Sequence, residues 1–172
     1  MVGYRLMEFA FTDEQAMIGE TARAFFAENA PSERTRKAMA ADGIDRALWQ
    51  GFCTELGLSG IALPEAHGGA GLGMVEFALV AEAAGAPVAA LPLLSSIAMA
   101  ASAIATVGSE AQKAFWLPQL ANGSVIGACA GMHNLSVDGD RLSGQFDFVP
   151  HGAIAELFVV GDANGAWIVR SD

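Results

Sequence analysis

Basic residues are scarce in this sequence. Of its 172 residues only nine are lysine or arginine, against 19 aspartates and glutamates, which gives a formal net charge of −10. This charge opposes binding to nucleic acid and to anionic membranes, because both require a positively charged protein surface. Three of the nine form one cluster, Arg34, Arg36 and Lys37 in the segment SERTRK. Two interpretations stay open for this cluster: a solvated helix face, or a contact with a ligand phosphate.

Cysteine is almost absent as well. Cys53 and Cys129 stand far apart and form neither a CxxC motif nor a metal-binding spacing. We therefore expect two buried, apolar thiols in a reducing compartment and no disulfide framework. The opening residues, MVGYRL, lack the apolar core of a secretory signal. Both features favour a cytoplasmic location.

The sequence also lacks an apolar run long enough to cross a membrane. Residues 83–106 carry no charge, but Gly85, Pro87 and Pro92 interrupt the first part of this stretch. The helix that remains, 93–107, is about 22 Å long, whereas the hydrocarbon core of a bilayer is about 30 Å thick. We therefore predict a buried core helix and no membrane span.

Helical signals fill the sequence up to about residue 122. The segments Thr12–Gln15 and Ser109–Gln112 are capping boxes, in which two side chains satisfy free N–H groups at a helix start. Pro118 follows in the last of these helices and is expected to end or kink it. Hydrophobic residues make up 53% of the chain, enough for a substantial core.

The spacing of apolar residues predicts three further helices. Ile44, Leu48, Phe52 and Leu56 repeat every four residues, and Gly57 follows as a helix stop. Residues 77–84 give another apolar face, which Gly85 ends. Residues 93–107 are apolar nearly all round, which is typical of a central helix.

After Asn122-Gly123 the pattern becomes that of strands. Strands are predicted around Val125–Cys129, Phe146–Val149, Leu157–Val160 and Trp167–Val169. Asp138-Gly139 predicts a two-residue hairpin turn, and the last two strands are joined around Asn164-Gly165. Helices followed by strands indicate an α+β fold rather than βαβ repeats.

We therefore predict an all-α helical bundle over residues 7–122, followed by a partial antiparallel β domain over residues 123–172. The last strand would present an open sheet edge, so we expect either a fragment or an edge that another segment covers.

The stretch GLSGIALPEAHGGAGLG, residues 57–73, is the densest in glycine. It lacks the third glycine of a dinucleotide-binding fingerprint, and no Walker motif occurs. A lipase-type oxyanion loop would require a serine in G-x-S-x-G, which is also missing. The remaining interpretation is a tight turn between packed helices. The histidines, His67, His133 and His151, share no metal-binding spacing, so we predict no metal site.

Three blocks in one order nevertheless resemble a known family. They are FAFTDEQ from Phe9, then LGLSGIALPEAHGGAGLG followed by Glu76 and Glu82, then GSEAQKAFWLPQLANG from Gly108. Together they are similar to the N-terminal half of an acyl-CoA dehydrogenase, with the resemblance extending from Phe9 to about Val160. The family fold has an N-terminal helical domain, a middle β domain and a C-terminal helical domain.

The resemblance implies a flavoprotein oxidoreductase of lipid metabolism. Members of the family bind FAD and oxidise an acyl-CoA substrate to enoyl-CoA, as oligomers that pass electrons to an electron-transfer flavoprotein. A glutamate removes the α-proton while a hydride leaves the β-carbon. That glutamate belongs to the C-terminal domain, and neither Glu65 nor Glu82 matches its position, so we assign no catalytic residue.

The resemblance also implies site residues. Those on the acyl-chain wall are Leu94, Ile97, Ala98 and Met99, for which plain core packing is an alternative. Those that contact flavin are Ala128, Ala130, Gly131, Phe148 and Pro150. Phe148-Val149-Pro150 stands where the family has tryptophan-x-threonine. The phenylalanine ring can still stack on flavin, whereas proline offers neither a hydroxyl nor an N–H group.

Two hypotheses about function follow. The chain is the N-terminal portion of a flavin-dependent acyl-CoA dehydrogenase-like enzyme, without the domain that carries the catalytic base. Alternatively, it is a degenerate, non-catalytic subunit that assembles with a flavin-bearing partner and stabilises it. Under both hypotheses the chain alone is expected to be colourless and inactive.

Overall fold

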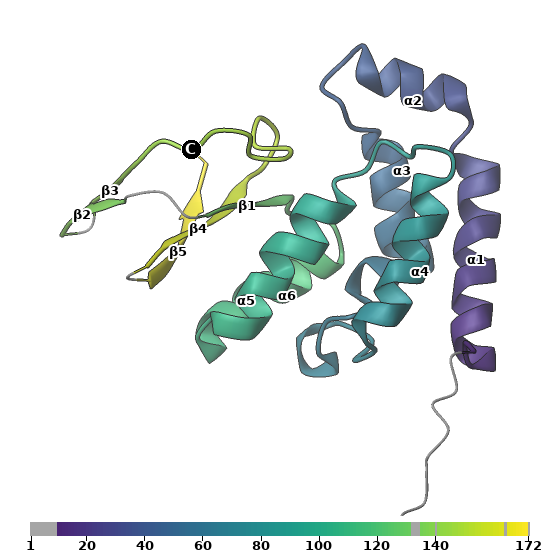
Figure 1. Cartoon of the computed structure of the whole chain (residues 1–172), viewed down its shortest axis with the longest axis horizontal. Helices are drawn as coiled ribbons and strands as arrows, with labels where there is room; N and C mark the ends of the chain where they lie inside the picture. The colour runs from purple at the N-terminus through teal and green to yellow at the C-terminus, as the bar shows by residue number, and fades with distance from the viewer. Residues whose placement is uncertain (1–9, 132–134, 140, 164, 172) are drawn as a thin grey trace, which may run out of the picture.

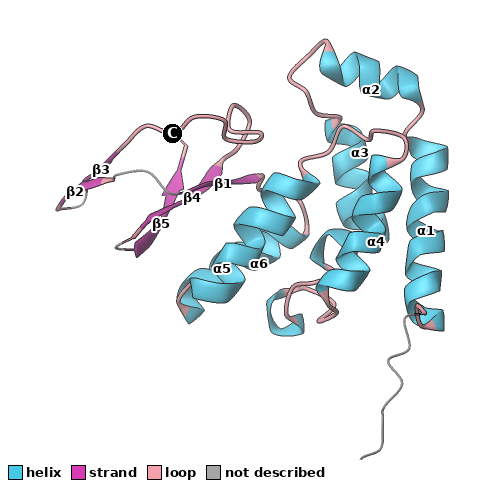
Figure 2. Cartoon of the chain, in the orientation of Figure 1, coloured by secondary structure: helices cyan, strands magenta, loops and turns pink. Residues whose placement is uncertain are grey.

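The computed structural model describes residues 10–131, 135–139, 141–163 and 165–171. The helices gather on one side of the molecule and the strands on the other, as the α+β prediction requires (Figure 1). Figure 2 shows the change from helix to strand within one continuous chain. Helix α6 and strand β1 are the neighbouring elements at that change, so the junction lies between Ala121 and Gly127.

The helical part contains both short and long elements. They are α1 (Asp13–Asn29), α2 (Ser32–Met39), α3 (Arg46–Gly51), η1 (Phe52–Leu56), η2 (Leu58–Gly60), η3 (Glu65–His67), α4 (Met74–Gly85), η4 (Leu93–Ala101), α5 (Ser102–Val107) and α6 (Glu110–Ala121).

Both predicted capping boxes are present. At the start of α1, the Thr12 hydroxyl accepts from the Gln15 amide at 3.2 Å, and the Gln15 side chain accepts from the Thr12 amide at 3.0 Å. Ser109 and Gln112 repeat the arrangement at the start of α6. Each box satisfies two N–H groups that a helix start leaves without partners.

The helix predicted from Ile44 begins two residues later than its apolar spacing indicates. Asp45 is the N-cap of α3, and its carboxylate accepts from the Leu48 amide at 3.0 Å. Ile44 precedes the cap and is buried beside the helix. The helix ends as predicted at Gly57, which adopts a left-handed φ of +67°.

The predicted central helix over 93–107 is confirmed, with a different helical geometry in its first part. Residues Leu93–Ala101 form the π-helical segment η4, and Ser102–Val107 continue as α5. A π-helix is wider than an α-helix and is rare outside single turns. Six of the nine residues of η4 are buried, as expected of a central helix.

Pro118 does not end its helix. Helix α6 continues to Ala121, and the Asn122 amide donates to the Pro118 carbonyl at 3.1 Å. Proline removes one N–H donor but keeps its carbonyl acceptor. The last turn of α6 therefore forms around it.

The described strands form two small sheets. Strands β1 (Gly127–Gly131), β4 (Leu157–Asp162) and β5 (Gly165–Arg170) are ordered β1-β4-β5. Strands β2 (Ser136–Asp138) and β3 (Arg141–Ser143) make a separate hairpin. Asp138 pairs with Arg141, so the predicted turn starts one residue later, at Gly139. Asn164, from the other predicted turn, lies outside the described residues.

The expected antiparallel pairing is wrong for one pair of strands. β4 and β5 are antiparallel, with Val160 opposite Trp167, but β1 and β4 are parallel, with Cys129 opposite Val159. The β2–β3 hairpin and a long loop separate β1 from β4 in the chain. This long connection lets the chain return to the same end of the sheet before β4 begins, which parallel pairing requires.

The strand predicted around Phe146–Val149 is also wrong. Residues 144–156 form turns and bends, which we call the 144–156 loop. Phe148 and His151 within it each adopt a φ of +57°. Side chains on L-residues disfavour this left-handed conformation, which ends regular strand geometry.

Two apolar clusters hold the fold together. The first lies among α1, α3, η1 and α4 and includes a stack in which the rings of Phe26 and Phe52 are 5.6 Å apart. The second joins α5 and α6 to the sheet through residues such as Leu117, Leu120 and Leu157, all fully buried. The sheet therefore packs directly on the helical part.

Candidate functional site

The π-helical segment η4 is the contact between the helical part and the first strand. The buried Ser96 hydroxyl accepts from the Gly127 amide at 3.0 Å. A Cβ atom added to Gly127 would lie 2.7 Å from the Cβ of Ala100, so only glycine permits this approach. Segment η4, which carries the predicted acyl-wall residues, and strand β1, which carries three of the predicted flavin-contact residues, thus lie next to each other.

The glycine-rich stretch, residues 57–73, forms a tight turn, as predicted. A Cβ atom on Gly69 would lie 2.0 Å from the Leu63 carbonyl oxygen. Four successive amides of the stretch already donate to carbonyls of the same segment. These bonds run from Gly69 to Pro64, from Ala70 to Gly60, from Gly71 to Leu63 and from Leu72 to Ile61. Donors engaged in this way do not cradle a phosphate.

The four predicted acyl-wall residues occupy three different environments. Leu94 is 61% exposed, whereas Ile97 is 1% exposed and packs in the first apolar cluster. Ala98 and Met99 are half-buried. Ile97 is therefore a core residue, whereas Leu94 is the most exposed of the four and is accessible to a ligand.

Leu94 borders an apolar groove of about 260 Å³. The groove lies between the end of α4 and the start of η4, and its lining is made of Phe77, Ala81, Ala84, Gly85, Val88, Ala89, Leu91, Leu93 and Leu94. No lining residue carries a charge or a polar side chain. Such a surface binds apolar groups through the area it removes from water.

The predicted flavin residues on β1 differ in exposure. Ala128 and Ala130 are buried, at 0% and 6% exposure, and Gly131 is exposed with open space beside it. Backbone groups alternate between the two sides of a strand, and the Gly127 amide points away from β4 toward Ser96. By this alternation, the backbone groups of Gly131 also face the free outer edge. Met132 and His133 lie outside the described residues.

The other two predicted flavin residues lie in the 144–156 loop. Phe148 is 100% exposed, so its whole ring faces solvent, and Pro150 is exposed beside it. A fully exposed phenylalanine on a left-handed backbone is unfavourable for an isolated chain. Its ring is available for stacking against another aromatic system.

A hydrogen bond between Ser95 and His151 fastens the loop to η4. The atoms Ser95 Oγ and His151 Nδ1 are 3.0 Å apart, and Ser95 is fully buried. Burial lowers the pKa of the His151 imidazole below its ordinary value. The sequence gives no sign of this pair, because Ser95 and His151 are 56 positions apart and no local pattern connects them.

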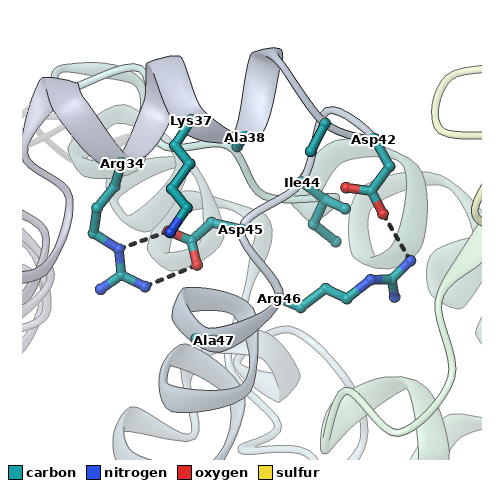
Figure 3. A pocket seen from close by; sticks show the side chains of 9 residues that line it. Arg34, Lys37, Ala38, Asp42, Ile44, Asp45, Arg46 and Ala47 are labelled. Carbon is teal, nitrogen blue, oxygen red and sulfur yellow. Dashed lines mark hydrogen bonds and ion pairs between the residues drawn. The ribbon is translucent and has the colours of Figure 1, made fainter.

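One member of the basic cluster, Arg34, forms an ion pair at a hollow of about 660 Å³ between α2 and α3. Arg34 donates to both carboxylate oxygens of Asp45, at 2.6 and 2.8 Å, and Arg46 pairs with Asp42 (Figure 3). The hydrogen bonds from Arg34 hold the pKa of the Asp45 carboxyl below its usual range. Asp45 therefore holds Arg34, and Lys37 adds one further charge at the rim of the hollow.

The described residues offer no ready reaction centre of their own. Among them, no three histidine, cysteine or acidic side chains gather in a way that would hold a metal ion. Burial raises the pKa of the Cys53 thiol to about 12, which suppresses the reactive thiolate. No helix within the described ranges is long and apolar enough to cross a bilayer.

Comparison with known proteins gives one consistent family. Residues 12–124 match the sequence profile described as "Acyl-CoA dehydrogenase, N-terminal domain". A curated relative, acyl-CoA dehydrogenase IpdE2 of Mycobacterium tuberculosis, is 33% identical over 129 residues, which are 74% of this chain and 40% of IpdE2. The chain thus spans about 40% of the length of this relative.

Solved structures agree with the sequence match. The structure titled "Tcur3481-Tcur3483 steroid ACAD G363A variant" is 31% identical with a TM-score of 0.78, and the match covers 93% of this chain and 48% of that one. The ChsE4-ChsE5 complex from Mycobacterium tuberculosis is 27% identical with a TM-score of 0.82, covering 95% and 49%. The similarity includes the strands as well as the helices.

Proposed function

Because the chain belongs to the acyl-CoA dehydrogenase family, we propose that it supplies one wall of the acyl site and one face of the flavin site of such a dehydrogenase. The complete enzyme would remove hydrogen from the α and β carbons of an acyl-CoA thioester. Residues beyond this chain, in the same polypeptide or in a partner, would supply the catalytic base.

The main support for this proposal is that η4 borders the apolar groove and also holds β1 and the 144–156 loop. At one end, Leu94 projects into the uncharged groove of about 260 Å³. On its buried side, Ser96 holds β1 and Ser95 holds the 144–156 loop. A single helical segment therefore stands between a surface suited to an apolar chain and a surface suited to an aromatic ring.

The acyl part of the proposal rests on the composition of the groove. Burying an apolar chain is worth about 0.8 kcal/mol for each methylene group, and the groove lining has no charged or polar side chain that would oppose it. One structurally similar protein is titled a "steroid ACAD". We therefore include bulky polycyclic acyl groups among the candidate substrates.

The residues on the flavin side fit FAD in part. Phe148 offers a free ring for stacking, and the exposed outer edge of β1 at Gly131 offers backbone groups. Pro150 offers no hydrogen-bond donor. When bound, FAD supplies the hydride acceptor, and an electron-transfer flavoprotein would then receive the electrons. The role of the chain is to orient the ring.

One observation favours the second candidate, a non-catalytic subunit beside a flavin-bearing partner. Pro150 stands where a flavin-bonding hydroxyl is expected from the family resemblance, and a similar structure is a complex of two chains, ChsE4 and ChsE5. In this arrangement Phe148 would face the partner rather than a flavin of its own.

Capture of FAD separates the two candidates. The tagged chain is co-expressed with a dehydrogenase-like chain encoded beside it, and FAD released from the purified complex is quantified by fluorescence. We expect FAD in the complex, and about 2- to 12-fold weaker FAD binding after Phe148→Ala, since one aromatic contact is worth about 0.5–1.5 kcal/mol.

Phe115→Ala is the matched control, because Phe115 is also exposed, at 58%, but lies on α6. Loss of FAD affinity in both variants or in neither contradicts a flavin contact at Phe148. A complex that holds FAD with unchanged affinity in Phe148→Ala and oxidises acyl-CoA supports the non-catalytic subunit. A complex without FAD overturns both candidates.

A further inference from the structure

We propose that His151 is a positioning residue whose hydrogen bond to Ser95 holds Phe148 at a fixed place relative to the Leu94 groove. The inference rests on the proposed function in one respect, namely that Phe148 contacts a flavin. The pair is a polar tie between the 144–156 loop and η4, and it joins a half-buried ring to a fully buried hydroxyl. The proposal therefore concerns how two ligand surfaces are held in register.

The conformation of the loop requires support from outside it. Phe148 and His151 both adopt a φ of +57°, which L-residues with side chains disfavour. Around His151, the Gly152 amide donates to the Val149 carbonyl at 3.0 Å, and the Ile154 amide donates to the His151 carbonyl at 3.0 Å. These two short-range bonds form a compact turn that places His151 against η4 and leaves Phe148 in solvent.

The surroundings of Ser95 fix the direction of the hydrogen bond. The Ser95 hydroxyl donates to the Pro92 carbonyl at 3.2 Å, one turn earlier in the chain. When the hydroxyl proton is engaged in this way, the His151 tautomer that completes the pair carries its proton on Nδ1 and donates it to Ser95 Oγ. Ser95 keeps a partner in Pro92 even when His151 is replaced, so a change at His151 leaves no buried hydroxyl unsatisfied.

Ionisation opposes docking of the ring, because the charged imidazolium keeps its Nδ1–H donor but costs more free energy to bury than the neutral ring. Segment η4 has no ionisable side chain, β1 has only the Cys129 thiol, and the loop has Asp147 and Glu156, of which Glu156 accepts from the Ile126 amide. Burial alone lowers the pKa of His151, with no charged group compensating. The open loop therefore binds a proton more readily than the docked loop.

The sign of the pH effect follows from this difference. Docking is at full strength above the ordinary histidine pKa of about 6.5, and it weakens as the pH falls from there through the lower pKa of the docked state. A purely structural hydrogen bond between groups that do not titrate would show no such dependence.

Hydrogen exchange of the whole chain tests the proposal. Protection factors of the Gly152 and Ile154 amides are measured between pH 8 and pH 5, after correction for intrinsic exchange rates. In the natural sequence we expect protection to fall across this range, since the docked loop has the lower His151 pKa. Ser95→Ala is expected to show that loss already at pH 8.

Two variants serve as matched controls. His151→Asn keeps a polar atom near the position of Nδ1 and tolerates the left-handed backbone, but it does not titrate, so its loop stays protected at both pH values. Ser96→Ala removes the neighbouring buried hydroxyl, which holds Gly127, so it should loosen β1 and leave the loop protected.

The proposal is overturned if Ser95→Ala leaves loop protection unchanged at pH 8, or if His151→Asn keeps the pH dependence of the natural sequence. FAD titration of the co-purified complex forms a separate arm. Failure of the natural complex to bind FAD would overturn the proposed function, while the exchange data would still decide whether His151 positions the loop.

Discussion

The Gly127 amide donates to the Ser96 hydroxyl at 3.0 Å, and this bond joins the first strand to the central helix. Ser96 is fully buried, and Gly127 has the Cβ of Ala100 and the side chain of Leu120 on its open side. A buried hydroxyl needs a partner, and the strand amide supplies one. The helical part and the sheet are thereby fixed to each other without a flexible linker.

Gly127→Ala should destabilise the chain by about 1–3 kcal/mol, because overpacking a dense core costs that much. The added methyl would lie 2.7 Å from Ala100 Cβ and 3.0 Å from Leu120 Cδ2. The free energy of unfolding in urea measures the change. Gly131→Ala, in the same strand with nothing within 4 Å, is the control and should unfold almost as the natural sequence does. Equal stability of all three proteins would refute the close packing of β1 on η4.

The turn in the glycine-rich stretch gives a second test. Gly69→Ala would place a methyl 2.0 Å from the Leu63 carbonyl oxygen, so we expect a loss of about 1–3 kcal/mol or failure to fold. Gly85→Ala, at the end of α4 with open space around it, should instead stabilise by about 0.5–1 kcal/mol. Thermal unfolding of the two variants decides the point, and shifts in the same direction would contradict the observed turn.

Asp45 combines an ion pair with a helix cap, and two substitutions separate these roles. Asp45→Asn keeps an oxygen for the Leu48 amide but loses the charge that faces Arg34, at a cost of up to about 1 kcal/mol for this partly exposed pair. Asp45→Ala also loses the cap, which adds about 1 kcal/mol. Urea unfolding at pH 7 gives both values, and an equal loss in the two variants would show that the cap contributes nothing.

The contribution of the Asp45 charge has a defined pH dependence. Its pKa is lowered in the folded chain, chiefly by the hydrogen bond from Arg34. The stabilisation is therefore complete above the ordinary pKa of 3.8, and it is lost as the pH falls from there through the lower, folded-state pKa. The difference in unfolding free energy between the natural chain and Asp45→Asn should shrink between pH 5 and pH 2. A constant difference would mean that the ion pair does not stabilise the fold.

Local patterns in the sequence predicted the features that depend on neighbouring residues. The Thr12 and Ser109 capping boxes, the stop at Gly57 and the central helix over 93–107 each arise from side chains within one or two turns of one another. The same holds for the α+β order of the chain, since periodicity changes sharply after residue 122.

Features that depend on distant contacts were not predictable in this way. The segment around Phe146–Val149 has the apolar residues of a strand, but the docking of His151 on Ser95 accompanies a turn there instead. The parallel direction of β1 and β4 is set by a long connection rather than by either strand. In the candidate site, the family resemblance pointed to Leu94 and Phe148. No sequence pattern near Ser95 or Ser96 predicts their contacts with His151 and Gly127.

The most direct test of the account is acyl-CoA binding by the flavin-loaded complex after Leu94→Asp. Leu94 and Met17 have similar exposure, at 61% and 63%, but only Leu94 borders the groove, so Met17→Asp is the matched control. A charge next to a buried apolar chain must be desolvated, and we predict at least a tenfold increase in the dissociation constant for Leu94→Asp, with little change for Met17→Asp. Equal affinity of the two variants for acyl-CoA would contradict an acyl wall at η4.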